Sequence, residues 1–122
     1  MKPIEVYQAF GQAQMSGTDA WKQFVTDDVT FTGPAAQASG LAEFTDLMAG
    51  FLPMVRGAEV HQVLESGDYV LTQISMDVAM PTGSTIRLDM SEWVKVENDK
   101  IKSFKVYYDA EEFRRHQSSQ ED

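Results

Sequence analysis

Residues 84–97 alternate between apolar and polar side chains with a period of two, the pattern of a strand that has one buried face. One parity carries, in order, Ile86, Leu88, Met90, Glu92, Val94 and Val96. Alternate residues of a strand point to opposite faces of a sheet, so this set predicts an apolar face on which Glu92 is the only charge. A carboxylate facing a core must be paired, hydrogen-bonded, protonated, or lining a cavity that holds water or a ligand. Glu92 is therefore the first candidate functional residue.

Three further segments have the composition of strands and end at short turns. They run over about 58–65, 69–80 and 101–108, and the turns are 66–67, 81–83 and 98–99. Long strands joined by short turns predict an antiparallel meander whose apolar face covers the helices. The opposite face is mixed, with Leu71, Trp93 and Tyr107 among polar groups. That much apolar area predicts a subunit interface, and hence a homodimer formed through the outer face of the sheet.

The first half of the chain predicts three helices and a short strand. Pro3 suits the first turn of a helix that runs to about Met15, and Ser16 or Thr18 can cap a short second helix. Residues 29–32 predict a strand, and Ser39 is expected to cap a third helix that ends before residue 53. Near the end of the chain, Asp109 stands three residues before Glu112, which predicts a cap for a final helical turn rather than a catalytic acid. Helices followed by strands indicate an α+β fold.

Composition limits the possible functions. The 122 residues suit one domain, expected over 1–115, followed by a polar, disordered tail over 116–122. The formal net charge of −9 argues against nucleic acids and anionic membrane surfaces as partners, because both require a basic patch. The absence of cysteine excludes disulfides, cysteine zinc sites and thiol nucleophiles. The sequence contains neither the apolar segment of a signal peptide nor a membrane span, so a soluble cytoplasmic protein is expected.

No cofactor or metal is expected. Two histidines and scattered acidic residues give no spacing typical of a metal site. There is also no glycine-rich loop of the kind that holds phosphate. The expected partner is a small, mostly apolar molecule with one or two polar groups.

Four segments carry a resemblance to a known family. They are residues 27–34 (DDVTFTGP), 60–70 (VHQVLESGDYV), 91–101 (SEWVKVENDKI) and 107–109 (YYD). In this order and spacing the chain resembles the SnoaL-like polyketide cyclase group of the NTF2-like superfamily, over about residues 4–113. The resemblance implies an NTF2-like cone, in which a curved antiparallel sheet wraps around N-terminal helices and leaves a deep apolar pocket. Relatives include Δ5-3-ketosteroid isomerases, cyclases, dehydratases, epoxide hydrolases and simple binding domains, so the fold does not decide the function.

The residues of the best-known relatives are not matched. Positions that align with the catalytic set of limonene-epoxide-hydrolase-like members fall near Phe31, Gly33, Ile74, Met76 and Val106, none of which can perform that chemistry. Steroid isomerases use a tyrosine with a protonated aspartate and a second aspartate as base. Tyr7 lies on the first helix, but no inward pair of aspartates accompanies it. The acid/base carboxylate that cyclases carry on the last strand would fall near Val106.

Two residues are candidates for catalysis. Glu92 in an apolar pocket would have a raised pKa and could move a proton beside a carbonyl. Alternatively, it accepts structural hydrogen bonds from donors on the helices, such as Tyr7 or Trp21. His61 is the second candidate: if Val63 faces inward then so does His61, and a Glu92–His61 pair could form. The alternative is that His61 is structural or exposed.

The expected ligand contacts are Tyr7, Trp21, Phe31, Met76, Leu88, Met90 and Val106. Methionine adapts to irregular gaps and varied ligands, although each one could equally belong to an ordinary core. The first functional hypothesis is a SnoaL-like protein that binds a small, mostly apolar ligand, with isomerase- or cyclase-type acid/base activity. The alternative is a non-catalytic ligand-binding or protein-interaction module of the same fold.

Overall fold

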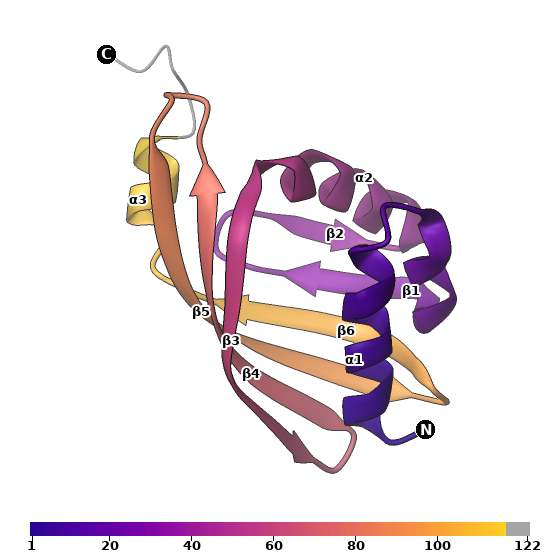
Figure 1. Cartoon of the computed structure of the whole chain (residues 1–122). Coiled ribbons are helices and arrows are strands. Elements are labelled where there is room, and N and C mark those ends of the chain that lie inside the picture. The colour runs from indigo at the N-terminus through magenta and orange to yellow at the C-terminus, as the bar shows by residue number, and fades with distance from the viewer. Residues whose placement is uncertain (117–122) are drawn as a thin grey trace.

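A strongly curved six-stranded sheet, with helices against its concave side, forms the body of the protein (Figure 1). The computed structural model describes residues 1–116, so all but the first residue of the predicted tail lies outside the described residues. The elements in chain order are α1 (Pro3–Gln14), η1 (Asp19–Phe24), β1 (Val25–Thr32), β2 (Gln37–Ser39), α2 (Leu41–Phe51), η2 (Leu52–Met54), β3 (Val55–Ser66), β4 (Tyr69–Ala79), β5 (Thr85–Glu97), β6 (Lys100–Tyr107) and α3 (Glu111–Arg115). The α+β fold expected from the sequence is confirmed.

Strands β3 to β6 form the predicted antiparallel meander. Asn98 and Asp99 have φ of 52° and 64°, which is the left-handed conformation that a tight two-residue hairpin turn requires. Strand β1 was expected to be shorter, and its parallel pairing with β6 was not predicted. The complete strand order is β2-β1-β6-β5-β4-β3. Bulges in β3 and at the β5–β6 pairing accompany the bend of the sheet.

The starts of α1 and η1 follow the predicted signals, while Ala110 and not Asp109 is the N-cap of α3, although Asp109 accepts a hydrogen bond from the backbone N–H of Glu111 at 3.0 Å. Thr18 caps η1, because its side-chain oxygen accepts a hydrogen bond from the backbone N–H of Ala20 at 3.2 Å. The expectation that Ser39 caps the third helix is wrong. Ser39 ends β2, and Gly40 precedes α2 with a φ of 90°, a conformation that side chains with a β-carbon rarely adopt. The backbone N–H of Ser39 donates instead to the carboxylate of Glu43.

Two groups of buried side chains form the core. The first lies under α1, η1 and α2 and contains an aromatic cluster of Phe10, Trp21, Phe44 and Phe104, in which the rings of Phe44 and Phe104 are stacked at 5.2 Å. The second lies toward α3 and is aliphatic and methionine-rich, with Ile74, Val78, Met80, Ile86, Leu88, Met90, Val106 and Phe113. Strand β5 supplies alternate residues to both groups, as its period-two pattern predicts. None of the helices within residues 1–116 is long and apolar enough to cross a membrane.

Candidate functional site

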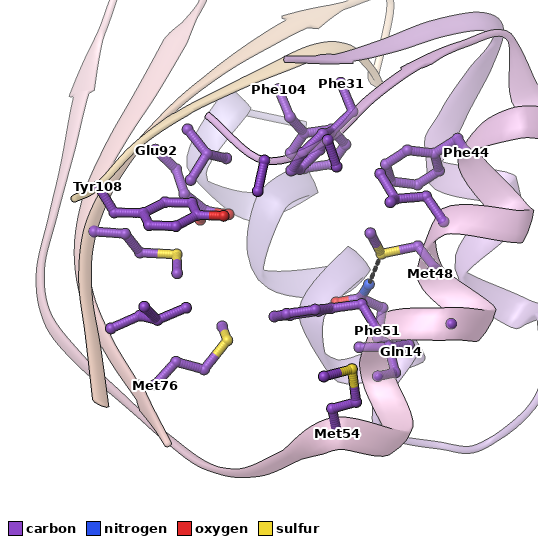
Figure 2. Close-up of a pocket in the computed structure, with 18 of the residues that line it drawn as sticks. Gln14, Phe31, Phe44, Met48, Phe51, Met54, Met76, Glu92, Phe104 and Tyr108 are labelled. Carbon is purple, nitrogen blue, oxygen red and sulfur yellow. Dashed lines mark hydrogen bonds between the residues drawn. The ribbon is translucent and has the colours of Figure 1, made fainter. Parts of the chain in front are cut away.

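A cavity of about 350 Å³ lies between the two core groups (Figure 2). Its walls come from the inward faces of β4, β5 and β6 on one side and from α2, η2 and the end of α1 on the other. The lining is mainly aromatic and methionine side chains, including Phe31, Phe44, Phe51, Phe104, Met48, Met54, Met76 and Met90. Methionine and phenylalanine side chains form a deformable, apolar surface that offers water no strong hydrogen-bond partners.

Glu92 is the polar group on the strand wall of this cavity. The hydroxyl of Tyr7, on α1, donates a 2.8 Å hydrogen bond to its Oε1 atom, and the hydroxyl of Thr72, on β4, donates a second at 3.1 Å to the same atom. Thr72 is the residue directly opposite Glu92 across the β4–β5 ladder, and its side chain is only 3% exposed. Among the described residues, Oε2 of Glu92 has no hydrogen-bond partner. One oxygen is therefore held by the protein while the other remains available.

The surroundings change the proton affinities of both hydrogen-bonded partners. Burial raises the pKa of Glu92 above its ordinary value, and the hydrogen bonds from Tyr7 and Thr72 oppose that rise. Burial also raises the pKa of Tyr7, and the neighbouring Glu92 carboxylate raises it further. Tyr7 therefore remains a hydrogen-bond donor throughout the neutral range, while Glu92 is the group that can exchange a proton.

Three other polar side chains reach the cavity. Tyr108 directly follows β6, two residues after Val106, which pairs with Glu92 across the β5–β6 ladder, and it lines the cavity. Its ring extends into the cavity in Figure 2, and burial raises its pKa. On the helical side, the amide of Gln14 donates to the sulfur of Met48 at 3.5 Å, which joins the end of α1 to α2. Asp46, on α2, is exposed.

The structure brings most of the predicted ligand contacts together. The side chains of Phe31, Met76, Leu88, Met90 and Val106 all line the cavity. Tyr7 does not line the cavity, but its hydroxyl donates to Glu92, which does. Trp21 does not: it is buried in the core between Phe10 and Phe44, with ring centroids 6.1 and 5.6 Å away. Of the two donors considered for Glu92, Tyr7 fills that role.

The conditional pairing of His61 with Glu92 does not form. Strand β3 has a bulge between Val60 and Gln62, so the alternation is interrupted, and Val63 faces inward while His61 is exposed on the outer face. There, Nε2 of His61 lies 2.7 Å from the hydroxyl of Ser75, which donates to Asp89 at 2.6 Å. His61 therefore belongs to a network on the face opposite the cavity.

Sequence reasoning missed Thr72 and the contribution of α2. Thr72 is the only polar residue in the inward parity of β4, so the rule that singled out Glu92 could also have found it. The residues from α2 and η2 had no such signal, because Phe44, Phe51 and Met54 read simply as an apolar stripe. Within residues 1–116, no group of three or more histidine or acidic side chains is placed to hold a metal ion.

Comparisons with known proteins agree with this architecture. A structure of an NTF2-like protein of unknown function from Cytophaga hutchinsonii is similar at a TM-score of 0.78 and 21% identity, covering 93% of this chain and 96% of that one. A Mesorhizobium loti protein, provisionally described as a SnoaL-like polyketide cyclase, is similar at a TM-score of 0.73 and 23% identity, covering 88% of this chain and 100% of that one. TerC, co-crystallised with polyporic acid, is similar at a TM-score of 0.76 and 18% identity, covering 93% of this chain and 96% of that one. At these identities the likeness concerns the fold alone.

The chain matches no curated protein. The model of the SnoaL-like domain family, however, matches residues 4–104, which include nearly all of α1, strands β3 to β5, the first half of β6 and both Tyr7 and Glu92. The resemblance noted in the sequence is thereby confirmed, and the chain belongs to the SnoaL-like domain family with an NTF2-like fold.

Proposed function

We propose that this protein binds a small, mostly apolar ligand in the cavity between its sheet and α2, with Glu92 as the polar anchor. The observation that carries the proposal is the arrangement of the Glu92 carboxylate. Two hydroxyl groups fix Oε1, and Oε2 has no partner among the described residues. Oε2 is thus left to accept a hydrogen bond from a donor on a ligand in the cavity, and the apolar lining would strengthen such a bond.

The size and chemistry of the cavity support the same proposal. Its volume of about 350 Å³ falls within the range of roughly 300–1,000 Å³ usual for small-molecule sites. Such sites are mainly apolar and aromatic with a few placed polar groups, which is the composition of this lining. One protein of similar fold, TerC, was co-crystallised with a small molecule, polyporic acid.

An NMR titration with a neutral aromatic alcohol, 2-naphthalenemethanol, tests the proposal. We expect saturable shifts at the amides of cavity residues on two different strands, such as Met90 and Val106, together with α2 residues such as Phe51. Shifts restricted to the outer face, around Trp93 and Tyr107, would instead indicate adsorption to exposed aromatic groups and would contradict the proposal.

A second function, acid/base catalysis, is favoured by the raised pKa of Glu92. A carboxylate with a pKa moved toward neutrality can take a proton from a carbon next to a carbonyl and return it, which is the step shared by isomerases and cyclases. Tyr7 and Thr72 would hold the carboxylate in place, and the apolar lining would exclude water. In this function Glu92 exchanges a proton with the ligand as well as binding it.

Deuterium exchange separates catalysis from binding. In D₂O, the methyl ketone of 2-acetylnaphthalene would lose its methyl proton signal faster with the protein than in buffer, because Glu92 removes a proton and a deuteron returns. The Glu92→Gln variant should exchange only at the buffer rate. Equal exchange with the wild type and the variant would exclude the proton-transfer role and leave ligand binding unaffected.

We also propose that two copies associate through the outer face of the sheet. Large apolar side chains are exposed there on neighbouring strands, namely Leu64, Tyr69, Trp93 and Tyr107. Contiguous exposed apolar area on one face is unusual for a monomer, and a two-fold axis would bury the same patch on both copies. The neighbouring charges, with Arg87 next to Glu59 and Asp77 at 3.2 and 3.3 Å, would form the polar rim.

A further inference from the structure

We infer that the ligand is a hydrophobic cation, in which an ammonium group binds Oε2 of Glu92 and an aromatic or aliphatic body occupies the apolar cavity. This inference rests on the proposed ligand binding and narrows its chemical class. It does not depend on the acid/base alternative. Three independent features of the cavity support it, namely the sign of its charges, the hydrogen bonding of Glu92 and the aromatic rings around it.

The charges along the cavity are all of one sign. Its lining includes two carboxylates, Glu92 and Asp46, and no lysine, arginine or histidine among the residues that the structure describes. Arg114 influences Tyr108 electrostatically, but its guanidinium donates at 2.9 Å to the carbonyl of Pro34. An anionic ligand would therefore meet a carboxylate without a counter-charge, whereas a cation would be attracted by it and by the net charge of −9.

The hydrogen bonds around Glu92 favour a charged partner over a neutral one. Tyr7 and Thr72 both donate to Oε1, so both bonds stabilise the ionised carboxylate rather than the protonated acid. Burial opposes ionisation, and the two hydroxyl groups carry no formal charge that could balance it. A buried carboxylate is stable when a positive charge is close, and within residues 1–116 no salt bridge provides one.

The aromatic lining provides the rest of a cation site. Phe31, Phe44 and Phe104 form one continuous surface, with centroid separations of 5.2 to 6.4 Å, and all three line the cavity. Tyr108 extends a fourth ring from the strand side in Figure 2. Ring faces attract cations within roughly 6 Å of the centroid, and desolvation strengthens this attraction. These rings line the same cavity as Glu92, so the body of a cationic ligand bound there would contact aromatic side chains.

Three naphthalene ligands that differ in one substituent test the inference. They are 2-(aminomethyl)naphthalene, 2-naphthalenemethanol and 2-naphthoate, measured by calorimetry with the full chain. We expect the amine to bind at least about tenfold more tightly than the alcohol, because a charge-assisted hydrogen bond is roughly twice as strong as a neutral one. The naphthoate should bind more weakly than the alcohol. In Glu92→Gln the amine should lose its advantage.

Glu97→Gln is the matched control, since Glu97 is the same residue type on the same strand but is exposed and paired with Lys95. The preference for the amine should survive this substitution. A second measurement covers the case in which Glu92→Gln fails to fold. In the wild type, the ratio of amine to alcohol affinity should fall as the pH is lowered through the pKa of Glu92, because the amine stays charged while the carboxylate is neutralised.

The titratable groups that contact Glu92 or share its cavity are Tyr7 on α1, Tyr108 after β6 and Asp46 on α2, while Arg114 on α3 acts on Tyr108. The pH dependence should persist in Asp46→Asn, which removes the other acid. If the alcohol binds in the cavity and the amine binds no more tightly, the cation inference is wrong and the proposed ligand binding stands. If none of the three ligands binds, both are wrong.

Discussion

The hydroxyl of Tyr7 donates a 2.8 Å hydrogen bond to the carboxylate of Glu92, across 85 positions of the sequence. This contact joins α1 to the inner face of β5 at the wall of the cavity. It fixes one oxygen of the carboxylate and, with Thr72, determines which oxygen can meet a ligand. The hydrogen bond between Tyr7 and Glu92 therefore contributes both to the stability of the fold and to the chemistry of the site.

Removal of the Tyr7 hydroxyl should destabilise the protein without enlarging the core. We expect Tyr7→Phe to lower the free energy of unfolding by about 1–3 kcal/mol, the usual cost of losing a hydrogen bond to a buried charged group. Urea unfolding at neutral pH measures the change. Tyr107→Phe is the control, because Tyr107 is exposed on the outer face. Equal stability of Tyr7→Phe and the wild type would show that the bond contributes nothing to the folded state.

Glu92 should make stability depend on pH in the direction opposite to a salt-bridged carboxylate. Its pKa in the folded protein is raised above the ordinary 4.5, so between these two values the folded state holds a proton that the unfolded chain has lost. Stability from this group is therefore present at low pH and falls as the pH rises through that interval. We expect Glu92→Gln to gain stability relative to the wild type between about pH 5 and about pH 8.

Urea unfolding of both proteins at the two pH values measures this relative gain. The same comparison with Glu97→Gln should give little change, since Glu97 is exposed. A constant difference between Glu92→Gln and the wild type would mean that Glu92 titrates as an ordinary surface carboxylate.

Much of this arrangement is encoded in local patterns. The alternation along β5 predicted both the inward face and the position of Glu92 on it, because the side-chain period of a strand is fixed. The turn at Asn98 and Asp99 could also be predicted locally, because few residue pairs accept two consecutive left-handed conformations.

Other features depend on contacts between distant segments, which local patterns do not contain. The parallel pairing of β1 with β6 is one such feature, and the position of α2 over the cavity is another. The bulge at His61 places its side chain on the outer face of the sheet, whereas regular alternation with Val63 would place it on the inner face. No turn residue in the sequence marks this bulge. Trp21 had a plausible spacing for a pocket residue, but it packs with other aromatic rings in the core.

The proposed dimer should depend on Trp93. Its side chain is 44% exposed at the middle of the outer face and packs edge-on against Tyr69, with ring centroids 6.0 Å apart. We expect Trp93→Lys to convert the dimer to a monomer, because a charge in the apolar centre of the patch would be desolvated on association. Sedimentation velocity gives the mass. Met15→Lys, at a residue that is 89% exposed after α1, should leave the dimer intact. A wild type that sediments as a monomer would contradict the proposal directly.

The most direct test of the central claim is to fill the cavity. Met76 lines it, and Met76→Trp would place a larger ring in the space proposed for the ligand, while Met15→Trp makes the same substitution on the surface. Calorimetric titration with 2-naphthalenemethanol should give saturable binding to the wild type and to Met15→Trp, and at least about tenfold weaker binding to a folded Met76→Trp. Binding that Met76→Trp leaves unchanged, or no saturable binding to the wild type, would contradict the account.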